Sequence, residues 1–203
     1  MARYIGPSTK IARKFGEPIF GSDKDFEKRN YPPGQHGLAA KRKKQREYGI
    51  QLKEKQKVRY MYGLLERQFH NTYLKASKMA GQRGENLLLL LESRLDNVIF
   101  RLGFARTRKE ARQIVDHKFV TVNGKVVNIP SYLVKAGDVI EIKESKKNTQ
   151  RMKDIVEVAG GRIVPEWLDV DAEKLQGTVK DLPTREQIDV PVDEMLIVEL
   201  YSK

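Results

Sequence analysis

The 203-residue chain contains no cysteine. This excludes disulfide bonds, thiol nucleophiles and thiolate-ligated metals, and it is consistent with a cytoplasmic protein. Long apolar runs are also missing: the longest aliphatic run, Leu87–Leu91, is far shorter than the roughly 20 residues that cross a bilayer. No apolar signal-peptide segment follows the first residue. We therefore expect neither a membrane span nor a secretory signal.

Catalytic signatures are absent from the sequence as well. There is no Gly-x-Ser-x-Gly turn, no Walker-type phosphate loop and no pair of histidines at i and i+4. The three histidines, His36, His70 and His117, lie far apart along the chain. We therefore expect no enzymatic activity, no metal site and no cofactor.

Positive charge is abundant and unevenly distributed. The formal net charge is +12. Residues 1–93 hold 20 Lys and Arg against 9 Asp and Glu, a net +11, whereas residues 94–203 hold 19 against 18, a net +1. Within that second part, residues 163–203 carry 4 basic and 10 acidic groups. A surface this polarised indicates a polyanionic partner on its basic side, and the acidic side should face away from it.

Residues 1–45 carry turn signals such as Pro32-Pro33-Gly34 and almost no apolar periodicity. We predict an irregular basic arm that orders on RNA, although a simple flexible tail has the same composition. Tyr31 and His36 could stack on an unpaired base or merely pack within their turn. The basic run that follows supplies the candidate RNA ligands Lys41, Arg42, Lys43, Lys44 and Arg46.

Residues 46–93 show helical patterning, with breaks expected near Gly49 and Gly63 and a short buried helix at 84–92. The apolar side comprises Leu52, Val58, Met61, Leu65, Phe69 and Tyr73. Lysines and arginines of the other side are either a solvated face or RNA ligands. The candidates there are Lys53, Lys57 and Arg59.

The segment 94–128 has the clearest local signals. A helical stripe of Leu95, Val98, Ile99 and Leu102 ends at Gly103. Next comes a Ser/Thr-x-x-Glu capping box, Thr107 to Glu110, before a second helix whose Ala111, Ile114 and Val115 face one way. Asn123-Gly124 then predicts a two-residue β-hairpin turn.

This segment also supplies most of the candidate RNA ligands, because arginine donates in a planar fork to phosphate. An alternative for Arg94 is a partly buried salt bridge to Asp96 or Glu92. For Arg108, Lys109 and Arg112 the alternative is simple solvent exposure without RNA contact, since they lie outside the apolar stripe of their helix. His117 could instead pack at the helix end. The candidates are Arg94, Arg101, Arg106, Arg108, Lys109, Arg112, His117, Asn123 and Lys125.

Further along, the pattern predicts a strand at 139–142, a polar linker at 145–153 and a final strand around 195–200. The fold class is α+β, with a mainly helical lobe and a small module of two helices packed on a short antiparallel sheet. We place the basic arm at 1–45, the helical lobe at 46–93 completed by 157–203, and the module at 94–156.

Residues 91–97, Arg101, Thr107 and Ala111-Arg112 resemble the signature of the S-four RNA-binding domain. Residues 31–37, 53–59 and 196–203 resemble the bacterial small-subunit ribosomal protein S-four family, so the resemblance spans the chain. Relatives in that family often carry a cysteine-ligated zinc near the N-terminus. This chain has no cysteine for such a site.

The resemblance implies a structural constituent of the small ribosomal subunit. It implies binding to a multi-helix junction in the 5′ domain of small-subunit rRNA, nucleation of that domain, and an influence on translational accuracy. It also implies the neighbours S-five and S-three, proximity to the region where mRNA enters, and a monomer within the ribosome. The alternative is an RNA-modifying enzyme anchored by the same module. That reading is disfavoured because the 93 residues before the module are basic and helical, and the 47 behind it are too few for a catalytic domain.

Overall fold

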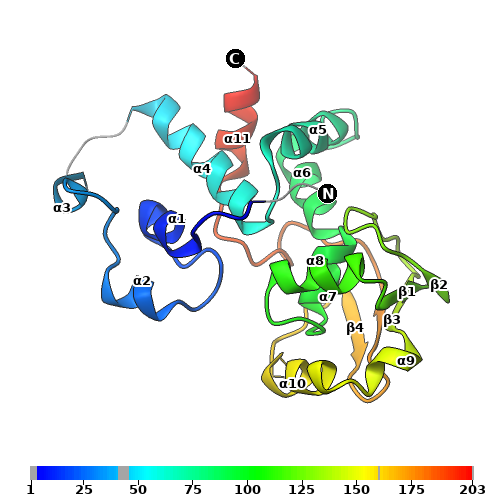
Figure 1. The fold of residues 1–203 in the computed structure, drawn as a ribbon. Helices are drawn as coiled ribbons and strands as arrows, with labels where there is room; N and C mark the ends of the chain where they lie inside the picture. The colour runs from blue at the N-terminus through cyan, green and yellow to red at the C-terminus, as the bar shows by residue number, and fades with distance from the viewer. Residues whose placement is uncertain (1–3, 41–45, 160, 203) are drawn as a thin grey trace. The chain divides into compact units, whose positions relative to one another are not determined.

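The computed structural model describes residues 4–40, 46–159 and 161–202. The chain divides into two compact units (Figure 1). The first consists of residues 1–75 and 191–203, and the second of residues 76–190. The first unit is helical in its described part, and the second combines helices with an antiparallel sheet, so the predicted α+β class is confirmed.

The first unit is built around α4 and the C-terminal α11. The helices are α1 (Ser8–Phe15), α2 (Lys24–Lys28), α3 (Gly37–Ala40), α4 (Glu47–Met61), α5 (Glu66–Ala76) and α11 (Glu194–Tyr201). Gly63, at φ +66°, separates α4 from α5 as predicted, whereas Gly49 lies within α4 and makes no break. Helices α4 and α11 are joined by a hydrogen bond in which Gln51 Nε2 donates to Glu199 Oε2 at 2.9 Å.

The N-terminal segment departs from the predicted irregular arm. Residues 8–15 form a helix whose Ala12 and Phe15 are buried, and Asp23 caps α2 by accepting from the backbone N–H groups of Asp25 and Phe26. The segment has few apolar residues, but Phe15 packs edge-on against Tyr60 of α4. Its order therefore comes from contacts with a distant helix, which a local periodicity count does not detect.

The final strand predicted around residues 195–200 is wrong, because this segment is helix α11. Asp193 caps it by accepting from the backbone N–H of Met195. At the other end the Tyr201 ring packs against Tyr73 at a centroid distance of 4.6 Å. A short continuous apolar run fits a buried strand and a buried helix equally well, and here the cap and the packing favour the helix.

The second unit contains the predicted pair of helices, the hairpin and the strand at 139–142, and it extends beyond the predicted module on both sides. Its helices are α6 (Arg83–Glu92), α7 (Leu95–Arg101), α8 (Arg108–Asp116), α9 (Glu144–Lys147) and α10 (Gln150–Ala159). Its strands are β1 (Val120–Val122), β2 (Lys125–Val126), β3 (Val139–Ile142), β4 (Leu168–Asp171) and β5 (Gln176–Val179). Within the described residues these form one antiparallel sheet in the order β2-β1-β3-β5-β4.

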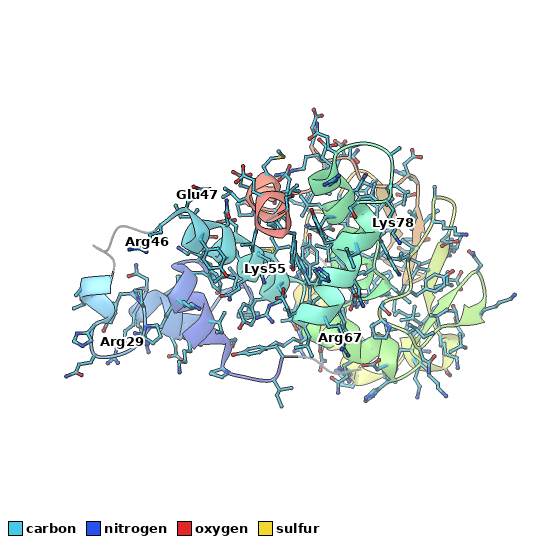
Figure 2. The ribbon with its side chains drawn as sticks, turned by 90° about the horizontal axis from the view of Figure 1, so that it is seen from above. Arg29, Arg46, Glu47, Lys55, Arg67 and Lys78 are labelled. Atoms are coloured by element: carbon cyan, nitrogen blue, oxygen red, sulfur yellow. The ribbon has the colours of Figure 1, made fainter. Side chains whose placement is uncertain are left out.

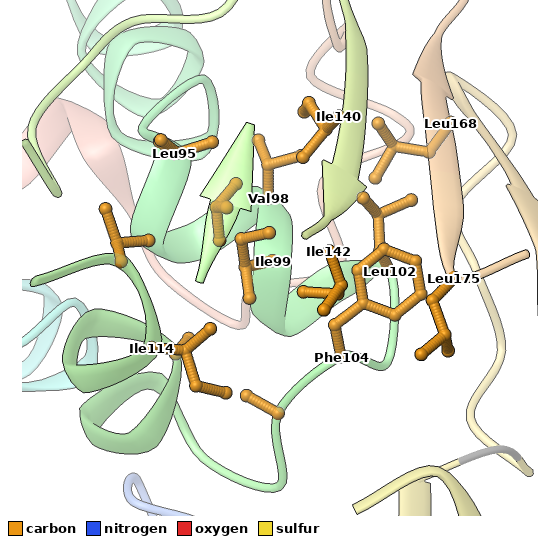
Figure 3. Close-up of a cluster of buried hydrophobic side chains, with 14 of the residues drawn as sticks. Leu95, Val98, Ile99, Leu102, Phe104, Ile114, Ile140, Ile142, Leu168 and Leu175 are labelled. Atoms are coloured by element: carbon orange, nitrogen blue, oxygen red, sulfur yellow. The ribbon is translucent and has the colours of Figure 1, made fainter. Parts of the chain in front are cut away.

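The core of the second unit gathers the predicted apolar stripes (Figure 3). Val98 and Ile99 of α7 and Ile114 of α8 are at most 1% exposed and belong to one cluster with strand residues such as Ile140. Trp167, 2% exposed, lies in the same cluster. The predicted helical stripes and the strand at 139–142 are therefore confirmed.

The hairpin between β1 and β2 also forms as predicted. Asn123 and Gly124 have φ values of +50° and +75°, which suit a turn that follows the twist of the flanking strands. The Asn123 side chain donates to Asp138 at 2.9 Å and accepts from the backbone N–H of Val139 at 2.9 Å. This side chain thus fixes the turn onto β3.

Two segments differ from the predicted boundaries. The polar linker predicted at 145–153 is wrong, because α9 and α10 occupy it and Met152 is buried in the core. In addition, β5 pairs with β3, with Ile140 opposite Gly177. The strands that follow residue 157 therefore belong to the sheet of the second unit, although the prediction assigned them to the helical lobe. The observed second unit, 76–190, is accordingly larger than the predicted module at 94–156.

Candidate nucleic-acid interface

Helices α6, α7 and α8 follow one another closely and bring charged side chains into a buried cluster. Ser93 and Arg94 are the two residues between α6 and α7, so Glu92 and Asp96 lie at adjoining helix ends. Thr107 caps α8, its Oγ1 accepting from the backbone N–H of Glu110 at 3.2 Å, as the capping box predicts. In place of the reciprocal bond, the Glu110 carboxylate accepts from the backbone N–H of Arg106.

Glu92 is the centre of the first group. Its carboxylate is 1% exposed and accepts two bonds from the Arg101 guanidinium, at 3.0 and 2.8 Å. It also accepts from the Asn97 amide at 2.7 Å and lies 4.0 Å from Arg108 Nη2. Asn97 Oδ1 in turn accepts from Arg108 Nε at 2.8 Å. Both arginines are therefore oriented by one buried carboxylate.

Asp96 is the centre of the second group. It accepts from Arg94 Nε and Nη2 at 3.1 and 2.7 Å, and Arg112 Nη1 lies 3.7 Å from it. Arg94 and Arg112 are 6% and 4% exposed. The buried-salt-bridge alternative for Arg94 is thus confirmed. The solvent-exposure alternative for Arg112 is wrong, because Asp96 draws its guanidinium inward.

Glu110 is the centre of the third group. Its carboxylate accepts from Arg106 Nε and Nη2 at 3.1 and 2.8 Å and lies 3.7 Å from Arg151 Nη2. The side-chain bonds from Arg106 hold the pKa of Glu110 below its usual range, and the same pair raises the pKa of Arg106. Arg151 belongs to α10, so this group ties α8 to a helix that the sequence did not predict.

These three groups form what we call the arginine network. In each group one carboxylate is shared by two guanidinium groups. Bidentate bonds fix the forks of Arg94, Arg101 and Arg106 while leaving other N–H groups of the same guanidinium able to donate. The network consists of Arg94, Arg101, Arg106, Arg108, Arg112 and Arg151 with Glu92, Asp96 and Glu110.

The remaining predicted residues of the second unit are placed outside the network. Lys109, His117 and Lys125 are exposed, and His117 follows the last turn of α8 without being buried there. Asn123 is engaged in the hairpin turn described above. The structure therefore brings together the predicted arginines but not these four residues.

The predicted residues of the first unit do not form a comparable cluster. Lys57 is 5% exposed and bonds Glu17 at 2.7 Å, so the expectation that it lies on an open basic face is wrong. The Arg59 guanidinium lies 4.4 Å from the Tyr60 ring centroid. Arg46 precedes α4 as an exposed residue (Figure 2), and Lys53 is half-buried on that helix.

The loop at residues 31–37 is ordered by Arg13. Its Nε donates to the Tyr31 carbonyl at 3.0 Å, and its guanidinium lies 5.0 Å from the Tyr31 ring centroid. The turn-packing alternative for Tyr31 is therefore realised, while His36 is exposed. Lys41, Arg42, Lys43 and Lys44 lie outside the residues that the structure describes.

Two arginines near this surface were missed by sequence reasoning. Arg151 lies in the segment interpreted as a linker, and Arg162 follows Gly161 in a region whose charge is mainly acidic. An amphipathic reading of residues 150–159 would have found the helix that carries Arg151. No metal site accompanies these residues, since the described part of the chain contains no group of three or more metal-binding side chains. None of the described helices is long and apolar enough to span a membrane.

Comparison with known proteins identifies the family of this chain. Residues 3–92 match the family model of the ribosomal protein S4/S9 N-terminal domain, and residues 93–140 match that of the S4 domain. Small ribosomal subunit protein uS4 of Agathobacter rectalis is 74% identical over 199 residues, 97% of each chain. The uS4 protein of Christiangramia forsetii is 55% identical over 203 residues, the whole of both chains. The chain belongs to the uS4 family.

The S4 domain match covers α7, α8 and the β1–β2 hairpin, the elements that carry most of the arginine network. The resemblance inferred from the sequence is confirmed. Because the uS4 family consists of structural ribosomal proteins, the expectation that the chain is not an enzyme is also confirmed.

Proposed function

We propose that the protein is a cytoplasmic structural constituent of the small ribosomal subunit that binds small-subunit rRNA through the arginine network. The observation that carries this proposal is the sharing of each of Glu92, Asp96 and Glu110 between two arginines. The shared carboxylates hold the guanidinium groups in fixed orientations, which suits phosphates held at defined positions.

The fixed geometry indicates folded RNA as the partner. Buried and bonded guanidinium groups cannot follow a flexible strand, so they select backbones that already have a matching arrangement. Exposed Arg106, with its side chain 49% exposed, and half-buried Arg108 contact the RNA, while Arg94 and Arg112 hold Asp96 and position the surface from within. Lys109, His117 and Lys125 add RNA contacts from the second unit, and Arg46 and Lys53 bind RNA from the first unit.

The proposal extends to the site on the ribosome. We propose that the RNA is a multi-helix junction of the 5′ domain, that binding nucleates assembly of that domain, and that the protein acts there as a monomer. Its neighbours would be the small-subunit proteins S-five and S-three, with the region where mRNA enters close by and an influence on translational accuracy. The excess of acidic over basic groups in residues 163–203 suits contact with basic proteins more than with RNA.

Chemical footprinting of small-subunit rRNA with and without the full-length protein tests this function. We expect protection confined to one junction of the 5′ domain, and weaker protection with Arg106→Ala. The matched control is Lys180→Ala, which also removes an exposed cation paired with a carboxylate, Asp169 at 3.7 Å. Diffuse protection without a preferred site, or equal weakening by both variants, would contradict the proposal.

A further inference from the structure

Arg162 lies between α10 and β4, outside the segment that matches the S4 domain. Its Nη1 donates to the carbonyl oxygens of Phe100 at 2.9 Å and Ala105 at 3.2 Å, and its Nη2 donates to that of Arg106 at 3.1 Å. A guanidinium has five N–H groups, so three bonds fix its plane and leave two donors. The group is therefore both held in place and still able to bind.

The charge of Arg162 is not matched by an acidic partner. Across the residues that the structure describes, no carboxylate lies within ion-pair distance of its guanidinium, and its acceptors are neutral carbonyls. Burial lowers the pKa of Arg162, and repulsion from Arg108 and Arg101 lowers it further. A bound anion would relieve that repulsion.

Arg162 and Arg108 converge on one aromatic ring. The guanidinium carbons of Arg162 and Arg108 lie 4.1 and 4.5 Å from the Phe100 ring centroid. The ring attracts both cations and keeps bulk water from part of each group, which strengthens any ionic bond formed at their edges. The following residue, Ile163, is 92% exposed, so the turn that carries Arg162 lies at the surface.

We propose that Arg162 and Arg108 together bind one phosphodiester of the RNA at the edge of the Phe100 ring. Arg162 thereby extends the arginine network with a contact from beyond the S4 domain. This inference rests on the proposed function, since it takes rRNA as the partner. The competing explanation is that Arg162 only clamps the carbonyl oxygens at the end of α7 and the start of α8.

Binding of the full-length protein to a transcript of the rRNA 5′ domain, measured over a series of salt concentrations, separates the two. We choose Arg162→Gln because glutamine removes the charge but retains amide donors for the carbonyls. We expect affinity to fall roughly ten- to hundredfold and the log–log salt slope to become shallower by about 0.7–0.9, as for one lost phosphate contact. The control is Arg185→Gln, in which the lost guanidinium also bonds a carbonyl, that of Ile188 at 3.2 Å.

An unchanged salt slope in folded Arg162→Gln would overturn the inference. If the variant does not fold, the wild-type protein is treated with an arginine-specific dicarbonyl reagent, with and without the transcript, and the modified sites are mapped by mass spectrometry. RNA should protect Arg162 and leave Arg185 reactive, and equal modification of Arg162 in both samples would overturn the inference. Failure of the wild-type protein to bind the transcript would instead refute the proposed function itself.

Discussion

Single side chains decide how much positive charge the second unit can hold. Glu92 is 1% exposed and contacts Arg101 and Arg108 at once, so it offsets part of the repulsion between them. The contact with Arg101 relies on the planar fork of arginine, which lysine lacks. The interface therefore depends on buried acidic residues as much as on exposed basic ones.

Replacing Glu92 with glutamine tests this role. The change keeps the shape of the side chain but leaves Arg101 and Arg108 without their shared counter-charge, so we expect the free energy of unfolding to fall by about 3–5 kcal/mol. Denaturant unfolding of the full-length protein measures the effect. Glu157→Gln, at an exposed position of α10, should change it by less than about 0.5 kcal/mol. Similar losses for both variants would mean that Glu92 has no special part in the network.

At the scale of elements, α8 is fixed at its start by the side chains of Thr107 and Glu110. The Thr107 hydroxyl satisfies the backbone N–H of Glu110, while the Glu110 carboxylate satisfies that of Arg106 and binds two arginines. Loss of the Glu110 charge would thus weaken both the helix start and its tie to α10.

The pH dependence of stability should reveal the contribution of the Glu110 carboxylate. The folded pKa of Glu110 lies below its ordinary value of 4.5, so its stabilising contribution is complete above that pH and is lost as the pH falls through the folded pKa. Thermal unfolding of the wild-type protein and of Glu110→Gln, measured from neutral pH downward, tests whether this contribution is lost in acid. We expect the two melting temperatures to converge under acid. A gap that stays constant or widens below pH 4.5 would contradict the assignment.

Elements with a local signal were predictable, and those held by distant contacts were not. The helix at residues 95–101 and the Asn123-Gly124 turn follow from periodicity and backbone conformation, which are properties of neighbouring residues. The helix at 8–15 buries its few apolar side chains against α4, so its own sequence looks irregular. Likewise, nothing adjacent to Arg112 indicates that Asp96 draws it inward. The arginines predicted within residues 94–112 do lie together, but which of them are buried depends on tertiary contacts.

At the scale of the molecule, the second unit depends on strands that lie far along the chain. Pairing of β5 with β3 covers what would otherwise be an open edge, and β4 extends the sheet further. Leu168 and Val179 of these strands are buried in the same cluster as α7 and α8. The S4 domain match at 93–140 therefore contains most of the network but only part of the hydrophobic core on which it rests.

Two fragments distinguish the folding unit from the matched segment. Residues 94–156 lack β4, β5 and Glu92, so we expect no cooperative thermal transition by circular dichroism. Residues 76–190 contain the whole described cluster and should unfold cooperatively. A cooperative transition of the shorter fragment, comparable to that of the longer one, would show that the later strands are dispensable.

The burial of Trp167 provides an internal optical probe of one unit. It is the single tryptophan of the chain, and it is 2% exposed in the core of the second unit. Of the eight tyrosines, only Tyr132 lies in residues 76–190. Selectively excited indole fluorescence should therefore shift to longer wavelength when the second unit opens, while near-ultraviolet tyrosine signals follow the first. The unlabelled, unmodified protein can thus report whether its two units melt together or in sequence.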